Sequence, residues 1–123
     1  MLRHLTTAIA ASLVLAFAAT AALAHAQLQK AVPAVGGTLT ASPKEIRLKF
    51  GEGVEPRFSG IALATQDGAA EPIGKPSLDP ADNSVLVATI AQQLKPGAYK
   101  VTWRAVSVDT HKTQGSFIFT VAP

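Results

Sequence analysis

The sequence predicts an all-β domain, a small antiparallel β sandwich or barrel, and two features of the chain indicate this class. After residue 25, apolar residues recur with the period of two that is typical of half-buried strands, and no helical period of useful length is present. Turn-forming dipeptides separate these runs. They are Gly36-Gly37, Ser42-Pro43, Asp67-Gly68, Asp79-Pro80, Asp82-Asn83 and Pro96-Gly97.

The first expected strands lie in the first half of the domain. Lys30–Pro33 fits a short edge strand that its proline ends. Glu45–Phe50 alternates throughout, with apolar residues on one face and charged residues on the other. Ser59–Ala64 and Val85–Ile90 are apolar, partly β-branched runs of strand length.

Two further strands are expected near the C-terminus, at Tyr99–Ala105 and Ser116–Val121. Alternation with polar residues indicates that Tyr99 and Trp103 belong to the core rather than to a ligand-stacking surface. The predicted inward-facing residues of all alternating strands are Ile46, Leu48, Phe50, Tyr99, Val101, Trp103, Ala105, Phe117, Phe119 and Val121.

The N-terminal residues have the organisation of a signal peptide. Arg3 supplies a positive charge, the stretch Leu5–Ala24 carries none, and Ala22-Leu23-Ala24 has the small-x-small form of a cleavage site. About 20 apolar residues are also enough for a membrane anchor, but the many Ala and Thr residues and the lack of flanking charges favour cleavage. We therefore expect a signal peptide at 1–24, an exported domain at 25–123 and a periplasmic location.

Composition excludes several chemistries from the exported domain. The chain has no Cys, and its single Met is the initiator. Disulfides, thiolate zinc sites and Cys nucleophiles are therefore ruled out, and no sulfur ligand of any kind remains. The net charge of +3 comes from dispersed residues, which gives no reason to expect a nucleic-acid partner.

Cleavage after Ala24 turns His25 into the first residue of the exported chain. A terminal histidine offers its α-amine and its imidazole together, a donor pair that suits Cu(II). The alternative explanation is a harmless residue left by cleavage. A competing small-x-small site, Ala24-His25-Ala26, would leave Gln27 first and discard the histidine.

The second candidate ligand group is Asp109-Thr110-His111. In extended backbone a spacing of two puts Asp109 and His111 on one face, with Cα atoms ~6.6 Å apart. The alternative is a turn capped by Asp109 beside a solvated His111. Together with His25, the two would supply amine, imidazole, carboxylate and imidazole, a set for which Cu(II) has the highest affinity among first-row divalent ions. No third segment offers a histidine, so a His-only zinc site is excluded.

These residues also carry a resemblance to a known family. The stretch Tyr99-Lys-Val-x-Trp-Arg-x-Val-Ser-x-Asp-x-His111 resembles that of the CopC family of periplasmic copper-binding proteins, as do the start His25-Ala26 and the segment Phe50-Gly51-Glu52. The resemblance covers 25–123. It implies a Greek-key fold, cupredoxin-like or immunoglobulin-like, and a role in copper homeostasis or resistance, with a CopD-type inner-membrane partner.

The resemblance also assigns roles to individual residues. His25, Asp109 and His111 match the family's Cu(II) ligands, and one Cu(II) per chain is expected. Glu52 matches a carboxylate near the metal, either as a weak ligand or as a hydrogen-bond acceptor behind the ligands; a solvated turn residue is the alternative. Some members carry a Met-rich Cu(I) loop, but Ala64–Pro72 has neither Met nor His, so no separate Cu(I) site is expected.

Two other functions remain open from the sequence. A copper oxidase of the lytic polysaccharide monooxygenase kind also uses an N-terminal histidine with a second histidine. That chemistry needs an open in-plane position, which Asp109 would fill, and the chain lacks an obvious aromatic substrate face. A metal-free immunoglobulin-like structural module is the third possibility. The sequence favours a copper protein that is not an enzyme.

Overall fold

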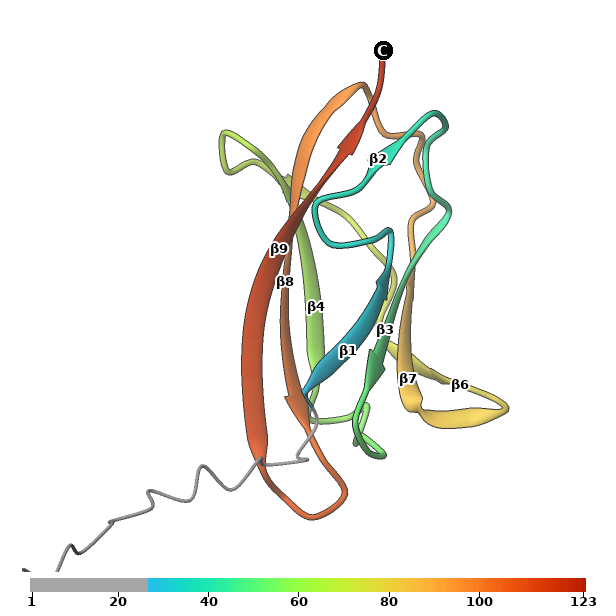
Figure 1. Ribbon diagram of the computed structural model, residues 1–123, viewed down its shortest axis with the longest axis vertical. Helices are drawn as coiled ribbons and strands as arrows, with labels where there is room; N and C mark the ends of the chain where they lie inside the picture. Colours follow the sequence, from blue (N-terminus) through green and yellow to red (C-terminus); the bar gives the residue numbers. More distant parts are fainter. Residues whose placement is uncertain (1–26) are drawn as a thin grey trace, which may run out of the picture.

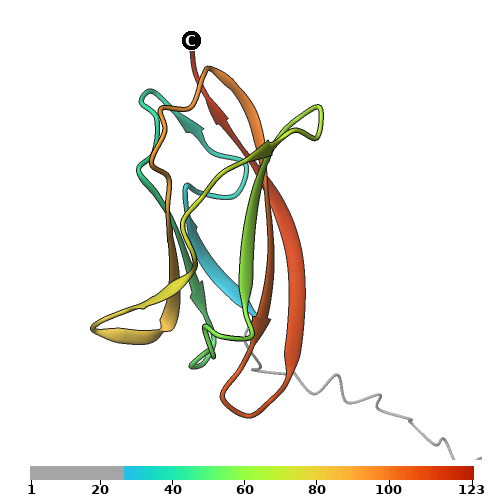
Figure 2. The same ribbon diagram turned by 180° about the vertical axis from the view of Figure 1, so that it is seen from behind.

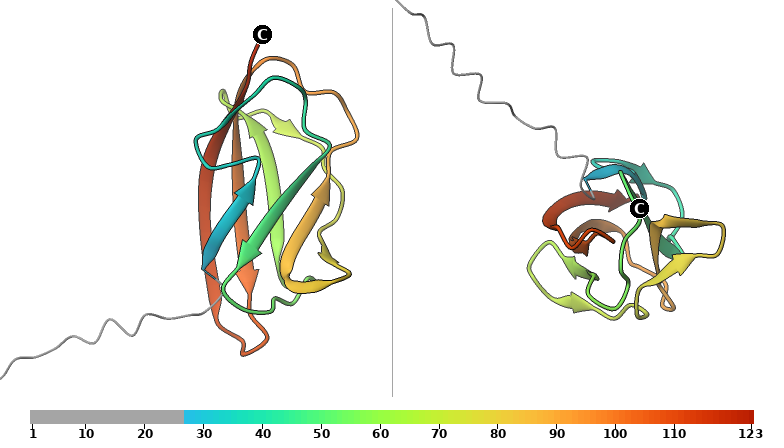
Figure 3. Two further views of the ribbon diagram at one scale, coloured as in Figure 1. Left: turned by 45° about the vertical axis from the view of Figure 1, so that its right-hand side comes forward. Right: turned by 90° about the horizontal axis from the view of Figure 1, so that it is seen from below.

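The structure is a computed structural model that describes residues 27–123. Within this range the strands are β1 (Leu28–Val32), β2 (Thr38–Leu39), β3 (Glu45–Phe50), β4 (Gly60–Thr65), β5 (Ala70–Glu71), β6 (Ser77–Asp79), β7 (Asp82–Thr89), β8 (Gly97–Val106) and β9 (Lys112–Val121). They form two sheets, one with the order β1-β3-β7-β6 and one with the order β2-β9-β8-β4-β5 (Figure 1). Figure 3 shows the two layers facing each other. The predicted all-β sandwich is confirmed.

The core lies between the two sheets and comes from the alternating strands. Every residue predicted to face inward is buried, and Ile46, Leu48 and Phe50 are fully buried. The core contains two contacts between aromatic rings. The rings of Phe50 and Trp103 meet edge to face at 5.3 Å between centroids, and those of Tyr99 and Phe119 stack at 5.6 Å. Both geometries are among those that aromatic pairs prefer.

Long antiparallel pairing builds most of the five-stranded sheet. β8 and β9 pair along their whole length, from Gly97 opposite Val121 to Val106 opposite Lys112. The sandwich is not antiparallel throughout, because the short strand β2 runs parallel to β9. That pairing is a correction to the predicted antiparallel arrangement. β2 lies next to β9 because the segment between β1 and β3 crosses from the four-stranded sheet to the five-stranded sheet.

The structure also contains strands that the sequence did not predict. β2, β5 and β6 are too short to show alternation. The dipeptide Asp82-Asn83, predicted as a turn, opens strand β7, because the actual turn is formed by Pro80 and Ala81. The hairpin β6–β7 is best seen in Figure 2. Strand β9 begins at Lys112, four residues before the predicted start at Ser116.

The outer face of the four-stranded sheet carries ion pairs between strands. Arg47 contacts Asp79 and also lies 3.4 Å from Glu45, and Lys49 Nζ lies 3.0 Å from Asp82. These charged side chains are those that alternate with the core residues of β3. Residues 27–123 form no helix that is long and apolar enough to cross a membrane.

Candidate metal centre

The loop between β8 and β9 is held in one conformation by its own backbone. Residues 107–111 connect the two strands. The Ser107 amide donates to the His111 carbonyl (2.9 Å), and the Thr110 amide donates to the Ser107 carbonyl (2.9 Å). Thr110 has a φ of 73°, the left-handed conformation that closes the turn. Asp109 and His111 lie on either side of Thr110, so the turn holds the backbones of these two candidate ligands in a fixed relation to each other.

Asp109 and His111 meet in this loop. The Oδ1 atom of Asp109 lies 3.2 Å from Nδ1 of His111, and both side chains are about half exposed. The sequence argument placed them on one face of extended backbone. That premise is wrong, because the residues lie in a turn with a left-handed Thr110. The turn itself brings the carboxylate and the imidazole together, and Asp109 also accepts from the His111 amide at 3.4 Å.

Ser107 is a residue of the site that the sequence did not single out. It is fully buried. Its hydroxyl donates to Oδ1 of Asp109, and its oxygen accepts from the His111 amide at 3.2 Å. The buried Ser107 hydroxyl therefore holds both candidate ligands in place, Asp109 through its carboxylate and His111 through its backbone amide. Its place within the motif was the only signal for it in the sequence.

Hydrogen bonds to the Asp109 carboxylate hold its pKa well below the ordinary value. The Ser107 hydroxyl lowers the pKa of Asp109 the most. Smaller lowering contributions come from the side chains of His111 and Glu52 and from the backbone of His111. Each contact favours the charged form of the carboxylate. Asp109 is therefore anionic at neutral pH, as a metal ligand must be.

The β3–β4 loop brings Glu52 to the same place. The Val108 amide donates to the Gly53 carbonyl (3.0 Å), and Val54 pairs with Ser107 in an isolated bridge. These contacts fasten the loop to the β8–β9 turn. The half-buried Glu52 side chain forms a hydrogen bond with Asp109. Glu52 is therefore a half-buried neighbour of Asp109 rather than the solvated turn residue of the alternative interpretation.

The described chain begins at the same end of the sandwich. The Gln27 carbonyl accepts from the Gly51 amide at 3.1 Å, and Leu28 pairs with Phe50. Gly51 directly precedes Glu52, so the start of β1 and the loops that carry Glu52 and His111 share one end of the molecule (Figure 1). The candidate ligand His25 and the predicted signal peptide lie outside the described residues.

The described side chains do not complete a metal site by themselves. Among residues 27–123, no group of three or more His, Cys, Asp and Glu side chains is arranged to hold a metal ion. The structure brings Asp109 together with His111 and with Glu52, two contacts that share one carboxylate. Four-coordinate binding would therefore need donors beyond this part of the chain.

Trp103 belongs to the core, as predicted. It is 8% exposed, contacts Phe50, and lies opposite Gly115 in the β8–β9 pairing. A Cβ atom at Gly115 would come within 2.7 Å of the indole ring, so only glycine leaves room for this ring. Trp103 lies four residues before Ser107, ~13 Å along the strand, which makes its fluorescence a reporter for the loop.

Fold and site together define a small β-sandwich domain that presents a carboxylate and an imidazole at one end. The chain belongs to the CopC family, because the model of the CopC domain matches residues 28–122. The family resemblance predicted from the motif around Trp103 and His111 is thus confirmed.

Known relatives and solved structures agree with this membership. Protein YobA of Escherichia coli K12 is 40% identical over 98 residues, which are 80% of this chain and 79% of that protein. The crystal structure of CopC from Methylosinus trichosporium OB3b is similar with a TM-score of 0.75 and 32% identity, covering 80% of this chain and 95% of that one. PcoC, a methionine-rich copper resistance protein from Escherichia coli, gives a TM-score of 0.69 at 33% identity, covering 79% and 98%.

Proposed function

We propose that this chain is an exported Cu(II)-binding protein of copper homeostasis or resistance. It is cleaved after Ala24 and holds one Cu(II) through the amine and imidazole of His25 together with Asp109 and His111. Glu52, half-buried beside Asp109, serves either as a weak further ligand or as a hydrogen-bond acceptor behind the ligands. The protein binds the ion without catalysis and passes it to a membrane partner of the CopD type.

The single observation that carries the proposal is the contact between Asp109 and His111. Metal–nitrogen bonds of about 2.0 Å place two ligands at right angles about 2.8 Å apart. The Asp109 Oδ1 and His111 Nδ1 atoms are 3.2 Å apart, so a small rotation of either side chain brings both onto one ion. Their half-exposed side chains leave the ion accessible to a further donor.

The position of Gln27 supports His25 as the source of the remaining donors. Two residues of extended chain span at most about 7 Å, and Gln27 is anchored beside Gly51. The reach of two residues from Gln27 is therefore enough for a histidine at position 25 to act as a donor at this end of the sandwich. A chain that starts at Gln27 lacks the imidazole of His25 and keeps only that of His111 at this end.

The donor chemistry supports Cu(II) over Cu(I). Thioethers and thiolates select Cu(I), and the exported domain has neither Met nor Cys. PcoC, by contrast, is described as methionine-rich. We therefore propose that this chain has a single Cu(II) site and no separate Cu(I) site.

The proposal is tested by determining the mass of the exported chain and titrating it with Cu(II). We expect a chain that begins at His25 and binds one Cu(II), with His25→Ala and His111→Ala each weakening binding by more than about 100-fold and leaving the fold intact. Asp109→Ala should cost less and add an exchangeable water, measured by relaxivity. Asp67→Ala, in the turn between β4 and β5, is the matched control. A chain that begins at Gln27, or a His111→Ala variant that binds normally, would refute the proposal.

A further inference from the structure

Charge is distributed unequally between the two sheets. On the four-stranded sheet, Arg47 and Lys49 form ion pairs with acidic residues of neighbouring strands. The three central strands of the other sheet, β4, β8 and β9, contain the cations Lys100, Arg104 and Lys112 and no acidic residue. None of these three forms a salt bridge within residues 27–123. The acidic residue of this sheet, Glu71, lies on the edge strand β5, so the central strands carry a net positive charge.

A groove of about 660 Å³ lies on this face and adds a fourth cation and an aromatic ring. Arg57 and Phe58 line it from the β3–β4 loop, and Arg104 and Lys112 line it from β8 and β9. Phe58 is 59% exposed, and the Arg57 guanidinium lies 5.8 Å from the centre of its ring. An exposed phenylalanine among cations is a feature of recognition surfaces, where an apolar anchor is combined with charge.

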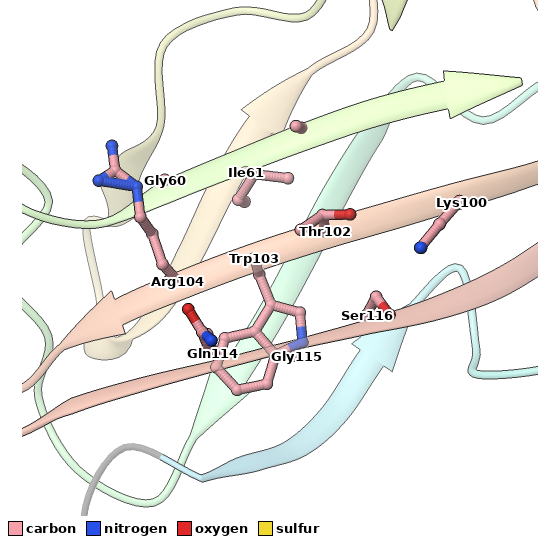
Figure 4. Close-up of a pocket in the computed structure, with 10 residues that line it drawn as sticks. Gly60, Ile61, Lys100, Thr102, Trp103, Arg104, Gln114, Gly115 and Ser116 are labelled. Atoms are coloured by element: carbon pink, nitrogen blue, oxygen red, sulfur yellow. The ribbon is translucent and has the colours of Figure 1, made fainter. Parts of the chain in front are cut away.

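A second hollow of about 570 Å³ lies on the same sheet, and Figure 4 shows the residues that line it. Arg104 and Gln114 line both hollows, and Lys100 lies further along β8. The Arg104 side chain lies over Gly60, where a Cβ atom would come within 2.8 Å of Nε. The bare backbone of Gly60 therefore lets this guanidinium lie flat at the junction of the two hollows.

The groove adjoins the candidate metal centre. Val106 and Lys112 line it, and these two residues form the pair that closes the β8–β9 hairpin. His111 directly precedes Lys112. A molecule seated in the groove would therefore lie beside the imidazole and carboxylate of the loop.

We propose that this face, from Arg57 and Phe58 to Lys100, is the docking surface for an acidic segment of the protein that exchanges copper with this chain. The inference rests on the proposed function for the identity of that partner. Charge complementarity selects an acidic partner, and the exposed ring of Phe58 selects one with an apolar residue between its acidic ones. The concave shape of the groove favours a peptide segment over a flat lipid surface.

The test uses the exported chain and a fluorescein-labelled peptide of glutamates interrupted by leucine, with a lysine counterpart as the negative probe. The variant is Arg57→Glu with Arg104→Glu. The matched control is Lys44→Glu with Lys75→Glu, which makes the same change of net charge at exposed positions outside β4, β8 and β9. We expect the groove variant to bind the glutamate peptide at least about tenfold more weakly and the control to bind within about twofold of the parent. Phe58→Ala should weaken binding without changing its salt dependence.

Three results would overturn the proposal. One is equal binding, or an equal loss, in both double variants. Another is binding to phosphatidylglycerol vesicles with no binding to the peptide, which would indicate a membrane surface. The third is self-association in sedimentation velocity that the groove variant abolishes, which would indicate a second copy. Peptide binding is measured on metal-free protein and Cu(II) titration on the same variants, so failure of the copper site is seen separately from failure of the surface.

Discussion

Replacement of Ser107 by alanine should loosen the proposed metal centre without replacing either of the proposed ligands Asp109 and His111. Ser107 is fully buried, and its hydroxyl bonds the Asp109 carboxylate and the His111 amide. Loss of a hydrogen bond to a charged group costs ~1–3 kcal/mol when the bond is buried, and this bond is only partly buried. The His111 amide keeps its 3.4 Å contact with Asp109, so we expect the lower part of this range for the free energy of unfolding.

The same substitution should lower the affinity for Cu(II) about 10- to 100-fold at neutral pH, the usual effect of removing a group that orients a metal ligand. It should also raise the pKa of Asp109 toward its ordinary value, because the Ser107 hydroxyl is the main cause of the lowering. Protons then compete with the metal at a higher pH. The affinity difference between Ser107→Ala and the parent should therefore widen as the solution is made more acidic.

The assay is Cu(II) titration followed by Trp103 fluorescence over a range of pH, together with urea denaturation of the metal-free proteins. Ser59→Ala is the matched control. Ser59 is also buried, and its hydroxyl bonds only backbone groups, the Glu55 carbonyl (2.8 Å) and the Val106 amide (3.0 Å). It should lose similar stability and bind copper normally. The reasoning is refuted if both serine variants bind Cu(II) alike at every pH.

Three further outcomes follow from other contacts. Gly115→Ala should destabilise the fold by ~1–3 kcal/mol and alter tryptophan emission, since its Cβ would be 2.7 Å from the indole of Trp103; an unchanged thermal midpoint would contradict this. Tyr99→Phe should cost ~0.5–1.5 kcal/mol in urea denaturation, because the hydroxyl donates to the Lys95 carbonyl at 2.6 Å. The pKa of Asp82 is lowered to about 2, chiefly by the Ser84 hydroxyl and amide and also by Lys49. The stabilising contribution of the Asp82 carboxylate is present above its ordinary pKa and is lost as the pH falls toward 2. Asp82→Asn should therefore reduce the loss of unfolding free energy between about pH 4 and pH 2. If the unfolding free energies of the variant and the parent fall equally over this range, the effect is ruled out.

Alternation predicted β3, β8 and the second half of β9 because each of these stretches buries one face only, whereas β4 and β7 were predicted from their apolar, partly β-branched residues. The residues of β3 and β8 alternate between core and solvent without a break, and this pattern is readable from the chain. β2, β5 and β6 depend on a neighbour for their hydrogen bonds and have too few residues to show a period. The extra residues of β9 before Ser116 are polar or glycine, and pairing with the long strand β8 rather than burial makes them part of the sheet.

The spacing in the sequence predicted that Asp109 and His111 would lie together, but for the wrong reason. A spacing of two suggested a strand, whereas Thr110 adopts a left-handed conformation in a turn. The contact of Glu52 with Asp109 depends on hydrogen bonds between two loops about fifty residues apart in sequence, which local patterns cannot show. Ser107 was missed for a related reason, because its importance comes from burial behind the ligands.

The fold and the proposed metal centre are built to be independent of each other. The core residues are buried between the sheets, whereas Asp109 and His111 are half exposed at one end and their loop is already held by hydrogen bonds from Ser107. In small structural zinc domains the metal replaces a core and the apo form unfolds. Here a bound ion adds stability only by mass action, ~4 kcal/mol at a thousand times the Kd. A chelator should therefore lower the thermal midpoint and leave the circular dichroism of the folded state unchanged, which is the behaviour a protein needs if it is to give up its ion and remain ready for the next.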